Sequence, residues 1–332
     1  MPLNLLTDIP GLRVGHATDL ALGSGVTAVL FEGGAVAAVS IQGGAPGTRD
    51  TALLDGDATL ERVDAIVLSG GSTFGLDAGG GVQAALREAG IGQRFAGIRI
   101  PLAPQAILFD LLNGGDKEWG RFPPYRELGH RAALAAAPGA FALGSVGAGT
   151  GATTATVKGG LGSASAVTAA GHTVAALVAV NAVGSPLVGE GPWFWAAPYE
   201  REGEFGGRGL PAAFTPDLLR PRLKGVDPTA TTIGLVATDA TLTKAQAKRL
   251  AVMAHDGLAR AVLPAHAPND GDTIFAAATG KVPLRDPVAE LTLLGHAATL
   301  VMARAIARGV FHAEALPVPG AQPCWQDRFG AG

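Results

Sequence analysis

Cysteine, aromatic residues and net charge are all scarce in this chain. Cys324 is the only cysteine, so an internal disulfide is excluded and a reducing cytoplasm is the expected compartment. Aromatic residues make up 5% of the 332 residues, and the net charge of -3 provides no basic surface, which argues against nucleic acid as a partner.

The most apolar stretch, residues 164–183, is interrupted by His172 and Asn181, so we expect no membrane-spanning helix. Residues 1–4 show no basic segment followed by an apolar one, and no secretory signal is expected.

Glycine, in contrast, is abundant, with 49 residues, and hydrophobic residues make up 48% of the chain. A chain of this length buries a large core, in one big domain or in two ordinary ones. Residues 144–162 are especially rich in glycine and nearly free of bulky side chains. Such a stretch lets the backbone approach another backbone or a ligand closely.

Hydrophobic patterns and turn residues predict strands and helices that mix without strict alternation. The predicted strands are residues 26–31, 36–41, 65–68, 98–102, 173–180, 233–237 and 273–278. The predicted helices are residues 77–89, 106–112, 131–137, a helix capped by residues 241–243 and ended by Pro264, and residues 288–307 with Gly309 past the end. We interpret residues 113–128 as a surface loop, 190–229 as an exposed connector and 316–332 as loosely ordered. This mixture favours layered sheets covered by helices over a doubly wound fold.

The stretch around Thr231 is the strongest candidate for chemistry. Residues 233–237 are apolar and β-prone, and the breakers Gly225 and Pro228 precede them, so Thr231 and its neighbour Thr232 stand where a loop becomes a strand. A threonine in that position could cut the peptide bond on its own amino side and then use its freed α-amine as a base. The alternative is that both threonines are ordinary β-branched strand residues.

Four other polar residues fit amide chemistry, each with a structural alternative. Asp270 and Asp272 stand two apart just before a strand, where they could orient an amine and a hydroxyl or simply form a solvated turn. Lys158 is the only charged residue among residues 132–171, so it could hold a lowered pKa or stabilise an oxyanion, or extend to the surface. Asn181 ends an apolar strand, where its amide could donate to an oxyanion or belong to a turn.

Several familiar sites are excluded by spacing. No two histidines have the i, i+4 spacing of a zinc-binding helix. Residues 70–75 resemble a nucleophile elbow but miss its Gly-x-Ser-x-Gly spacing by one residue. Residues 147–151 resemble a phosphate-binding loop, but the lysine and hydroxyl pair of a P-loop does not follow. We therefore expect neither a metal nor a cofactor.

A resemblance to a known family covers nearly the whole chain, with its segments in the right order. The matching segments are residues 14–19, 43–51, 68–77, 147–162, 180–181, 231–239, 254–260 and 270–275. In these segments the chain resembles the DmpA-type aminopeptidase family of self-processing N-terminal-nucleophile hydrolases. The resemblance is to its threonine-nucleophile branch in particular, which includes nylon-oligomer hydrolases.

The resemblance implies an α/β fold, a four-layer α-β-β-α sandwich of the DmpA and ornithine-acetyltransferase type. It implies one domain over residues 1–332 that cuts itself between Ala230 and Thr231. The products would be an α-subunit, residues 1–230, and a β-subunit, residues 231–332, which remain associated. Relatives commonly have asparagine before the nucleophile, so Ala230 implies slower maturation without changing which residue attacks.

The resemblance also implies a role for each candidate residue. Thr231 matches the nucleophile, Lys158 and Asn181 match positions that line the active site, and Asp270 and Asp272 match the carboxylate pair that orients the nucleophile. The expected activity is hydrolysis of small peptides or linear amides, such as 6-aminohexanoate oligomers, by a homotetramer of cut αβ units. Two alternatives stay open: an acyltransferase of the ornithine-acetyltransferase type, and a non-catalytic glycine-rich ligand-binding protein.

Overall fold

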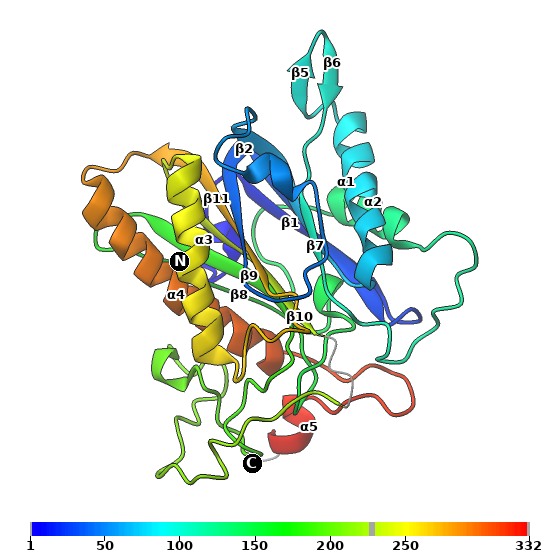
Figure 1. The fold of residues 1–332 in the computed structure, drawn as a ribbon, viewed down its shortest axis with the longest axis vertical. Coiled ribbons are helices and arrows are strands. Elements are labelled where there is room, and N and C mark those ends of the chain that lie inside the picture. Colours follow the sequence, from blue (N-terminus) through cyan, green and yellow to red (C-terminus); the bar gives the residue numbers. More distant parts are fainter. Residues whose placement is uncertain (1, 226–229, 331–332) are drawn as a thin grey trace.

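The structure of the protein, a computed structural model, describes residues 2–225 and 230–330. One nine-stranded sheet has the order β3-β7-β4-β2-β11-β10-β9-β8, with β1 paired to β2. A separate hairpin, β5 and β6, projects from it (Figure 1). The strands are β1 (Leu12–Asp19), β2 (Ser24–Ile41), β3 (Thr48–Arg49), β4 (Arg62–Ser69), β5 (Gln93–Phe95), β6 (Ile98–Ile100), β7 (Gln105–Ile107), β8 (Leu161–Val167), β9 (Thr173–Asn181), β10 (Thr231–Ala240) and β11 (Thr273–Val282). The helices are α1 (Asp77–Glu88), α2 (Tyr125–Leu134), α3 (Lys244–Ala261), α4 (Pro287–Phe311) and α5 (Trp325–Phe329).

Strand β2 connects the two halves of the large sheet. Its first half pairs with β1 and its second half with β11, and the register against β4 shifts between Leu30 and Ala35. Gly33 and Gly34 lie in this shift with φ of +76° and +75°, values that glycine adopts without steric cost. A register shift of this kind bends a strand. The sheet therefore continues as two layers, which face each other across an apolar core.

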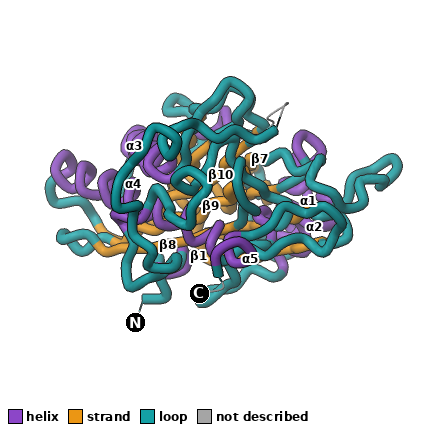
Figure 2. Tube along the Cα trace, turned by 90° about the horizontal axis from the view of Figure 1, so that it is seen from below, coloured by secondary structure: helices purple, strands orange, loops and turns teal. Residues whose placement is uncertain are grey.

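Three apolar clusters separate four layers of structure. One cluster lies between the two sheet layers and includes Val29, Leu68, Leu177, Leu235 and Phe275. A second lies between β8–β11 and helices α3 and α4, and a third lies between β1, β2, β4 and helices α1 and α2. Figure 2 shows the strands between these two helix pairs. The predicted α-β-β-α sandwich is therefore confirmed.

The central strand β10 shows why the layers form. Ile233, Leu235 and Ala237 point into the cluster between the sheets, while Val236 points into the cluster beneath α3 and α4. Successive side chains of a strand point to opposite faces, so an unbroken apolar run is buried on both sides. All ten residues of β10 are buried, which fixes its first residue, Thr231, inside the molecule.

Helix α4 is the longest helix, and its length and mean hydropathy would allow it to cross a membrane. It packs on β8 and β9, where Met302, Ile306 and Val310 are fully buried. Gly309, which we expected past the end of this helix, lies inside it. A Cβ on Gly309 would lie 2.7 Å from the amide nitrogen of Gly162 in β8. The glycine is therefore needed for close helix–strand contact, and not for capping.

Several other element predictions are wrong in part. Residues 106–112 are not helical, because Gln105–Ile107 is strand β7, which pairs in parallel with the buried strand β4. Helix α2 begins at Tyr125, inside the predicted surface loop, because the buried Tyr125 and Leu128 give it an apolar face. The strand predicted at 98–102 exists only as β6 of the projecting hairpin.

The connector and the tail are better anchored than predicted. Phe194 and Phe205 of the connector are buried, and Phe194 stacks on Trp325 with ring centres 6.0 Å apart. Trp325 belongs to α5 in the C-terminal tail and is itself buried. These aromatic contacts tie the tail and the connector to the core. Pro228, the predicted breaker before the cut, lies outside the described residues.

Candidate active site

Strand pairing brings three of the predicted site residues together at the start of β10. Thr231 is the first residue of β10, and its register partner in the antiparallel neighbour β9 is Asn181. On the other side, Ala230 forms a parallel bridge with Asp270, which precedes β11. Thr231 is 3% exposed. The hydroxyl is thus held rigidly between segments that are distant in sequence.

The Thr231 hydroxyl lies against the carbonyl that it would attack. Its Oγ1 donates a hydrogen bond to the carbonyl oxygen of Ala230. The same oxygen accepts the backbone N–H of Gly271 at 3.1 Å. A Cβ on Gly271 would lie 2.6 Å from Thr231 Oγ1, so only glycine leaves room for the hydroxyl here. The Ala230 carbonyl is therefore polarised by one backbone donor and faces the candidate nucleophile.

Asp272 is completely buried and holds the backbone next to the nucleophile. Its Oδ1 accepts the Thr232 N–H at 2.8 Å, and its Oδ2 accepts the backbone N–H of His266 at 3.0 Å and ring Nδ1 of His266 at 2.8 Å. Burial by itself raises the pKa of this carboxyl, but the hydrogen bonds from His266 and Thr232 outweigh burial and lower the pKa. Asp272 therefore stays ionised.

Asp270 occupies the opposite environment. Its Oδ1 accepts the Gly271 N–H at 3.1 Å, while its Oδ2 is buried and has no hydrogen-bond partner within residues 2–225 and 230–330. Burial and then the negative charge of Asp272 raise the pKa of Asp270. Both carboxyls are buried, so the solvated-turn alternative is wrong. Asp270 Oδ2 can take a donor that the described chain does not supply.

Asn181 is fixed by bonds at both ends of its amide. Its Oδ1 accepts the Thr153 N–H at 3.0 Å and the ammonium of Lys224 at 2.8 Å, and its Nδ2 donates to the Phe109 carbonyl at 2.8 Å. Oδ1 must accept and Nδ2 must donate, so this network sets the orientation of the amide. One Nδ2 hydrogen remains for another acceptor. Asn181 is the last residue of β9, and therefore not a turn residue.

Lys158 is buried in the glycine-rich segment, so the surface-lysine alternative is wrong. Its Nζ donates to the carbonyls of Gly149 at 3.1 Å and Gly159 at 2.8 Å. Burial lowers the pKa of Lys158 to about 7, with the charge of Asp110 acting against burial and that of Lys224 acting with it.

The structure gathers the five predicted residues unequally. Thr231, Asn181, Asp270 and Asp272 meet around the start of β10 through the pairings and hydrogen bonds given above. Among the hydrogen bonds of the described residues, none joins Lys158 to any of the other four. Lys158 lies one step away from them, because its antiparallel bridge partner Thr153 donates its N–H to Asn181 Oδ1.

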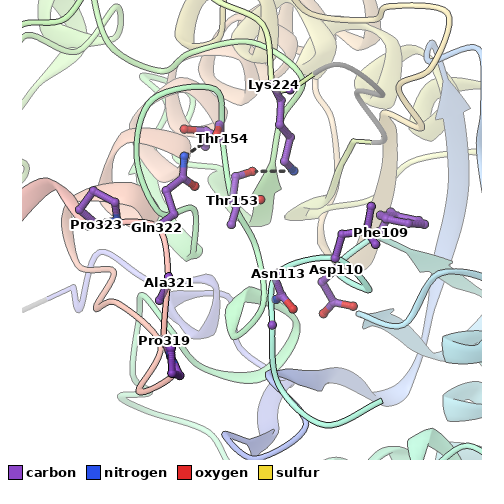
Figure 3. A pocket seen from close by; sticks show the side chains of 14 residues that line it. Phe109, Asp110, Asn113, Thr153, Thr154, Lys224, Pro319, Ala321, Gln322 and Pro323 are labelled. Atoms are coloured by element: carbon purple, nitrogen blue, oxygen red, sulfur yellow. Dashed lines mark hydrogen bonds between the residues drawn. The ribbon is translucent and has the colours of Figure 1, made fainter. Parts of the chain in front are cut away.

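A cavity of about 770 Å³ adjoins this cluster (Figure 3). Its wall includes Lys224 and Thr153, the two residues that bond to Asn181 Oδ1. The cavity is lined by Phe109, Asp110, Leu112, Asn113, Gly114, Thr153, Thr154, Lys224, Gly225, Pro319, Gly320, Ala321, Gln322 and Pro323. The C-terminal tail thus supplies one side of the cavity. A cavity of this size suits a small ligand.

The sequence did not single out Asp110, Lys224 or His266. Asp110 is buried and accepts Ser24 Oγ at 2.6 Å and the Gly71 N–H at 2.7 Å, and burial raises its pKa. The elbow-like loop at residues 70–75 therefore holds a carboxyl instead of presenting a nucleophile. None of the three residues belongs to a recognisable motif, although Asp110 is a lone aspartate shortly after an apolar run, which was an available signal. Within residues 2–225 and 230–330, no three His, Cys, Asp or Glu side chains converge as metal ligands.

The four layers, with Thr231 buried at the start of the central strand β10, have the arrangement of the N-terminal-nucleophile hydrolase fold. The chain matches the model of Peptidase family S58 over residues 4–322, and it belongs to that family.

Relatives and solved structures agree with this assignment. The chain is 42% identical to an uncharacterised aminopeptidase of Mycobacterium tuberculosis, over 98% of both chains. It is 29% identical to the 6-aminohexanoate-oligomer endohydrolase of Kocuria sp. (strain KY2), over 83% of this chain and 75% of the other.

A Burkholderia sp. beta-aminopeptidase superposes with a TM-score of 0.70 at 25% identity, covering 97% of this chain and 90% of that one. The l-aminopeptidase d-ala-esterase/amidase of Ochrobactrum anthropi, at 21% identity and a TM-score of 0.69, shares the fold over 96% of this chain and 89% of its own. The protein is therefore a hydrolase of peptide or amide bonds, which disfavours the acyltransferase and non-catalytic alternatives.

Proposed function

We propose that the protein cuts itself between Ala230 and Thr231 and then hydrolyses small peptides or linear amides through Thr231. The observation that carries this proposal is the contact between the Thr231 hydroxyl and the Ala230 carbonyl, which is polarised by the Gly271 N–H. Holding two reacting groups in contact can lower a barrier by about 7 to 11 kcal/mol.

In self-cleavage, Thr231 Oγ1 attacks the Ala230 carbonyl carbon. The hydroxyl proton passes to the departing amide nitrogen, the C–N bond breaks, and an ester joins the two residues. Water then hydrolyses that ester, leaving a carboxylate on Ala230 and a free α-amine on Thr231. The Gly271 N–H, which donates to the Ala230 carbonyl in the uncut chain, would stabilise the oxyanion of this step.

In turnover, the α-amine of Thr231 acts as the general base for its own hydroxyl. An N-terminal amine has an ordinary pKa near 8, close enough to neutral pH for this role. Asp270 Oδ2, which has no hydrogen-bond partner among the described residues, is a suitable acceptor for that amine, and Asp272 holds the Thr232 N–H next to it. The substrate acyl group is transferred to Thr231 and released by water. The free Nδ2 hydrogen of Asn181 and the Gly271 N–H would stabilise the oxyanion. Lys158 would hold its bridge partner Thr153, which bonds to Asn181.

The adjoining cavity supports a small linear amide with a free amino end as substrate. Asp110 is a buried carboxyl that lines the cavity, and it offers a partner for an ammonium group. The Kocuria relative is named for 6-aminohexanoate oligomers and the Burkholderia neighbour for beta-aminopeptidase activity. A volume of about 770 Å³ accommodates a short oligomer of either kind.

Exchange of Thr231 tests the proposal. Thr231→Ala should abolish self-cleavage, visible as a single 33.2 kDa species by intact mass, and should also abolish release of amine from amide substrates. Thr231→Ser keeps the hydroxyl and should retain both reactions at reduced rates. Thr232→Ala, one residue further along β10, is the matched control. Amide hydrolysis by the Thr231→Ala protein at the wild-type rate would refute the mechanism.

We also propose that the cut unit has an α-subunit, residues 1–230, and a β-subunit, residues 231–332, assembled as a homotetramer in the cytoplasm. The family resemblance and the single cysteine support these points.

A further inference from the structure

Lys224 connects the cavity to Asn181, and the proposed mechanism has given it no role so far. Its Nζ donates to Asn181 Oδ1 at 2.8 Å and to the Thr153 carbonyl at 3.2 Å. Its backbone N–H donates to the Val183 carbonyl at 2.9 Å, so the residue is anchored beside the end of β9. Figure 3 shows its side chain extended toward Thr153 at the edge of the cavity.

The bond from Lys224 limits how Asn181 can be used. An amide side chain can present either its oxygen or its nitrogen to a neighbour, and only Nδ2 can donate to an oxyanion. A cation on one end of the amide requires the oxygen at that end, so Nδ2 must point away from Lys224. The Thr153 N–H reinforces this orientation at 3.0 Å. Hydrogen bonds to a charged group are about twice as strong as neutral ones, so Lys224 is the stronger of the two donors.

We propose that Lys224 is a positioning residue that locks the Asn181 amide with its Nδ2 toward the reaction centre. This inference rests on the proposed function, because it assigns Asn181 the oxyanion that forms when Thr231 attacks. Lys224 touches neither the nucleophile nor the scissile carbonyl in the described contacts, so its effect passes through Asn181.

The charges around Lys224 fit this role. Burial lowers its pKa to about 7, while the carboxyls of Asp270 and Asp110 act in the opposite direction. An amine keeps its N–H donors whether or not it is protonated, so Lys224 can donate to Asn181 in both states. The ammonium, which has no acceptor, is the form that excludes Nδ2 from this position. The residue belongs to the connector, six positions before Ala230, so the same side chain serves the first attack on Ala230 and later attacks on substrate.

The test compares Lys224→Met with wild type after both are fully cut, as judged by intact mass. Loss of one oxyanion donor costs about 100- to 1000-fold in kcat, so loss of its orientation alone should cost about 10- to 100-fold, with KM within about threefold. Lys224→Arg retains a donor and should recover most of the loss. Lys248→Met is the matched control, because Lys248 also donates to a backbone carbonyl, that of Val39, but lies exposed on α3.

A double-mutant cycle separates positioning from a general structural role. If Lys224 acts through Asn181, then Lys224→Met combined with Asn181→Ala should be no slower than Asn181→Ala alone. Two losses that multiply would overturn the inference. A kcat of Lys224→Met equal to that of the wild type would also overturn the inference. Thermal melting shows whether each variant is folded, and Lys224→Ala, which also lacks a side-chain donor, replaces Lys224→Met if the latter does not fold.

A second readout keeps this inference distinguishable from the proposed function. The side-chain amide of Asn181 gives a pair of ¹⁵N-coupled proton resonances, identified by their loss in Asn181→Asp. These resonances should shift or broaden in Lys224→Met and stay unchanged in Lys248→Met. Unchanged Asn181 resonances in Lys224→Met would overturn the inference even if the wild type shows no hydrolysis, whereas an inactive wild type with shifted resonances would overturn only the proposed function.

Discussion

The two carboxyls beside the nucleophile differ in ionisation although they stand two residues apart. Asp272 is surrounded by donors, which lower its pKa, whereas burial and the charge of Asp272 raise the pKa of Asp270. Groups whose environments push their pKa values apart commonly divide the acid and base work of a site. We infer that Asp272 fixes the backbone at Thr232 while Asp270 receives the new α-amine.

Exchange of either carboxyl for an amide tests this division of roles. Asp270→Asn and Asp272→Asn should each lower turnover by a factor of about 100 or more while the fold stays intact, in line with the usual size of general acid–base effects. Asp256→Asn, on the exposed side of α3, is the control and should be neutral. Steady-state kinetics measures the turnover of each variant, and circular dichroism shows whether the variant is folded. Near-normal turnover in both site variants would remove the carboxyls from the mechanism.

Lys158 should make stability depend on pH in the alkaline range. Burial lowers its pKa from 10.5 to about 7 in the folded protein. Between these values the unfolded chain holds a proton that the folded protein lacks, so the free energy of unfolding rises with pH. Wild type should therefore gain stability relative to Lys158→Met between pH 7 and 10.5, by about 5 kcal/mol at most. Urea titrations at several pH values measure the difference in free energy of unfolding between the wild type and Lys158→Met. A difference that does not change with pH would contradict the prediction.

The candidate residues differ in how far the sequence could identify them. Four of them could be identified, because they stand at strand ends and both the local sequence pattern and the family resemblance mark these positions as candidates. These four are Thr231, Asn181, Asp270 and Asp272. Lys224 gives no comparable signal, because its partner Asn181 is 43 residues away and only the tertiary fold brings them together.

At the scale of elements, the approach of α4 to β8 depends on two glycines that face each other. A Cβ on Gly309 of α4 would lie 2.7 Å from the Gly162 nitrogen, and a Cβ on Gly162 of β8 would lie 1.8 Å from the Ala305 carbonyl oxygen. Backbone atoms cannot move aside as a flexible side chain can. The two glycines therefore set the distance between the helix layer and the sheet.

Gly309→Ala should destabilise the protein. Alanine favours a helix over glycine by about 1 kcal/mol, but here the methyl group would clash with the β8 backbone, and overpacking costs typically about 1 to 3 kcal/mol. Gly80→Ala in α1 is the matched control, because its nearest neighbour is the flexible end of Arg49 at 3.4 Å. Chemical denaturation should show a loss for Gly309→Ala and no loss, or a small gain, for Gly80→Ala. A Gly309→Ala protein as stable as the Gly80→Ala protein would contradict the explanation that Gly309 is needed for close contact with β8.

Elements with strong periodicity were predictable, and elements built from small residues were not. Helix α3 begins after Thr243, whose hydroxyl accepts the Gln246 N–H as the pattern predicts. Strand β8, Leu161–Val167, was missed because it consists mostly of glycine, serine and alanine and has a single β-branched residue, Val167, at its end. Its burial comes from α4, which covers it, and that packing is not visible in a local pattern.

At the scale of the whole molecule, the exposed hairpin bears on assembly. Phe95, Ile98 and Ile100 are 44%, 64% and 44% exposed on the projecting β5–β6 hairpin. We predict a homo-oligomer of the αβ unit, with a tetramer as the expected state and an interface more apolar than ordinary surface. Light scattering at micromolar concentration should give a multiple of 33.2 kDa, and a mass near 33.2 kDa itself would refute the prediction.

The order of strands determines what self-cleavage would do to the fold. The segment after Thr231 contributes β10 and β11, which are neighbours in the sheet. Strand β9 lies on one side of this pair and β2 on the other, and both belong to residues 1–230. The helices α3 and α4 of the same segment cover that layer (Figure 1). Separation of the two fragments would therefore break hydrogen-bonded edges on both sides and expose the core.

Freshly made protein should accordingly convert into two fragments that co-purify. Cleavage after Ala230 gives 230 and 102 residues, about 23 and 10 kDa by their share of the 33.2 kDa chain. Edman sequencing of the smaller fragment should read Thr-Thr-Ile-Gly. Ala230 has no side-chain amide to help polarise the bond, so Ala230→Asn should speed the conversion, as followed by intact mass over time. A protein that stays in one chain yet hydrolyses amides at full rate would contradict the N-terminal-nucleophile mechanism, because Thr231 would then have no free α-amine to serve as its base.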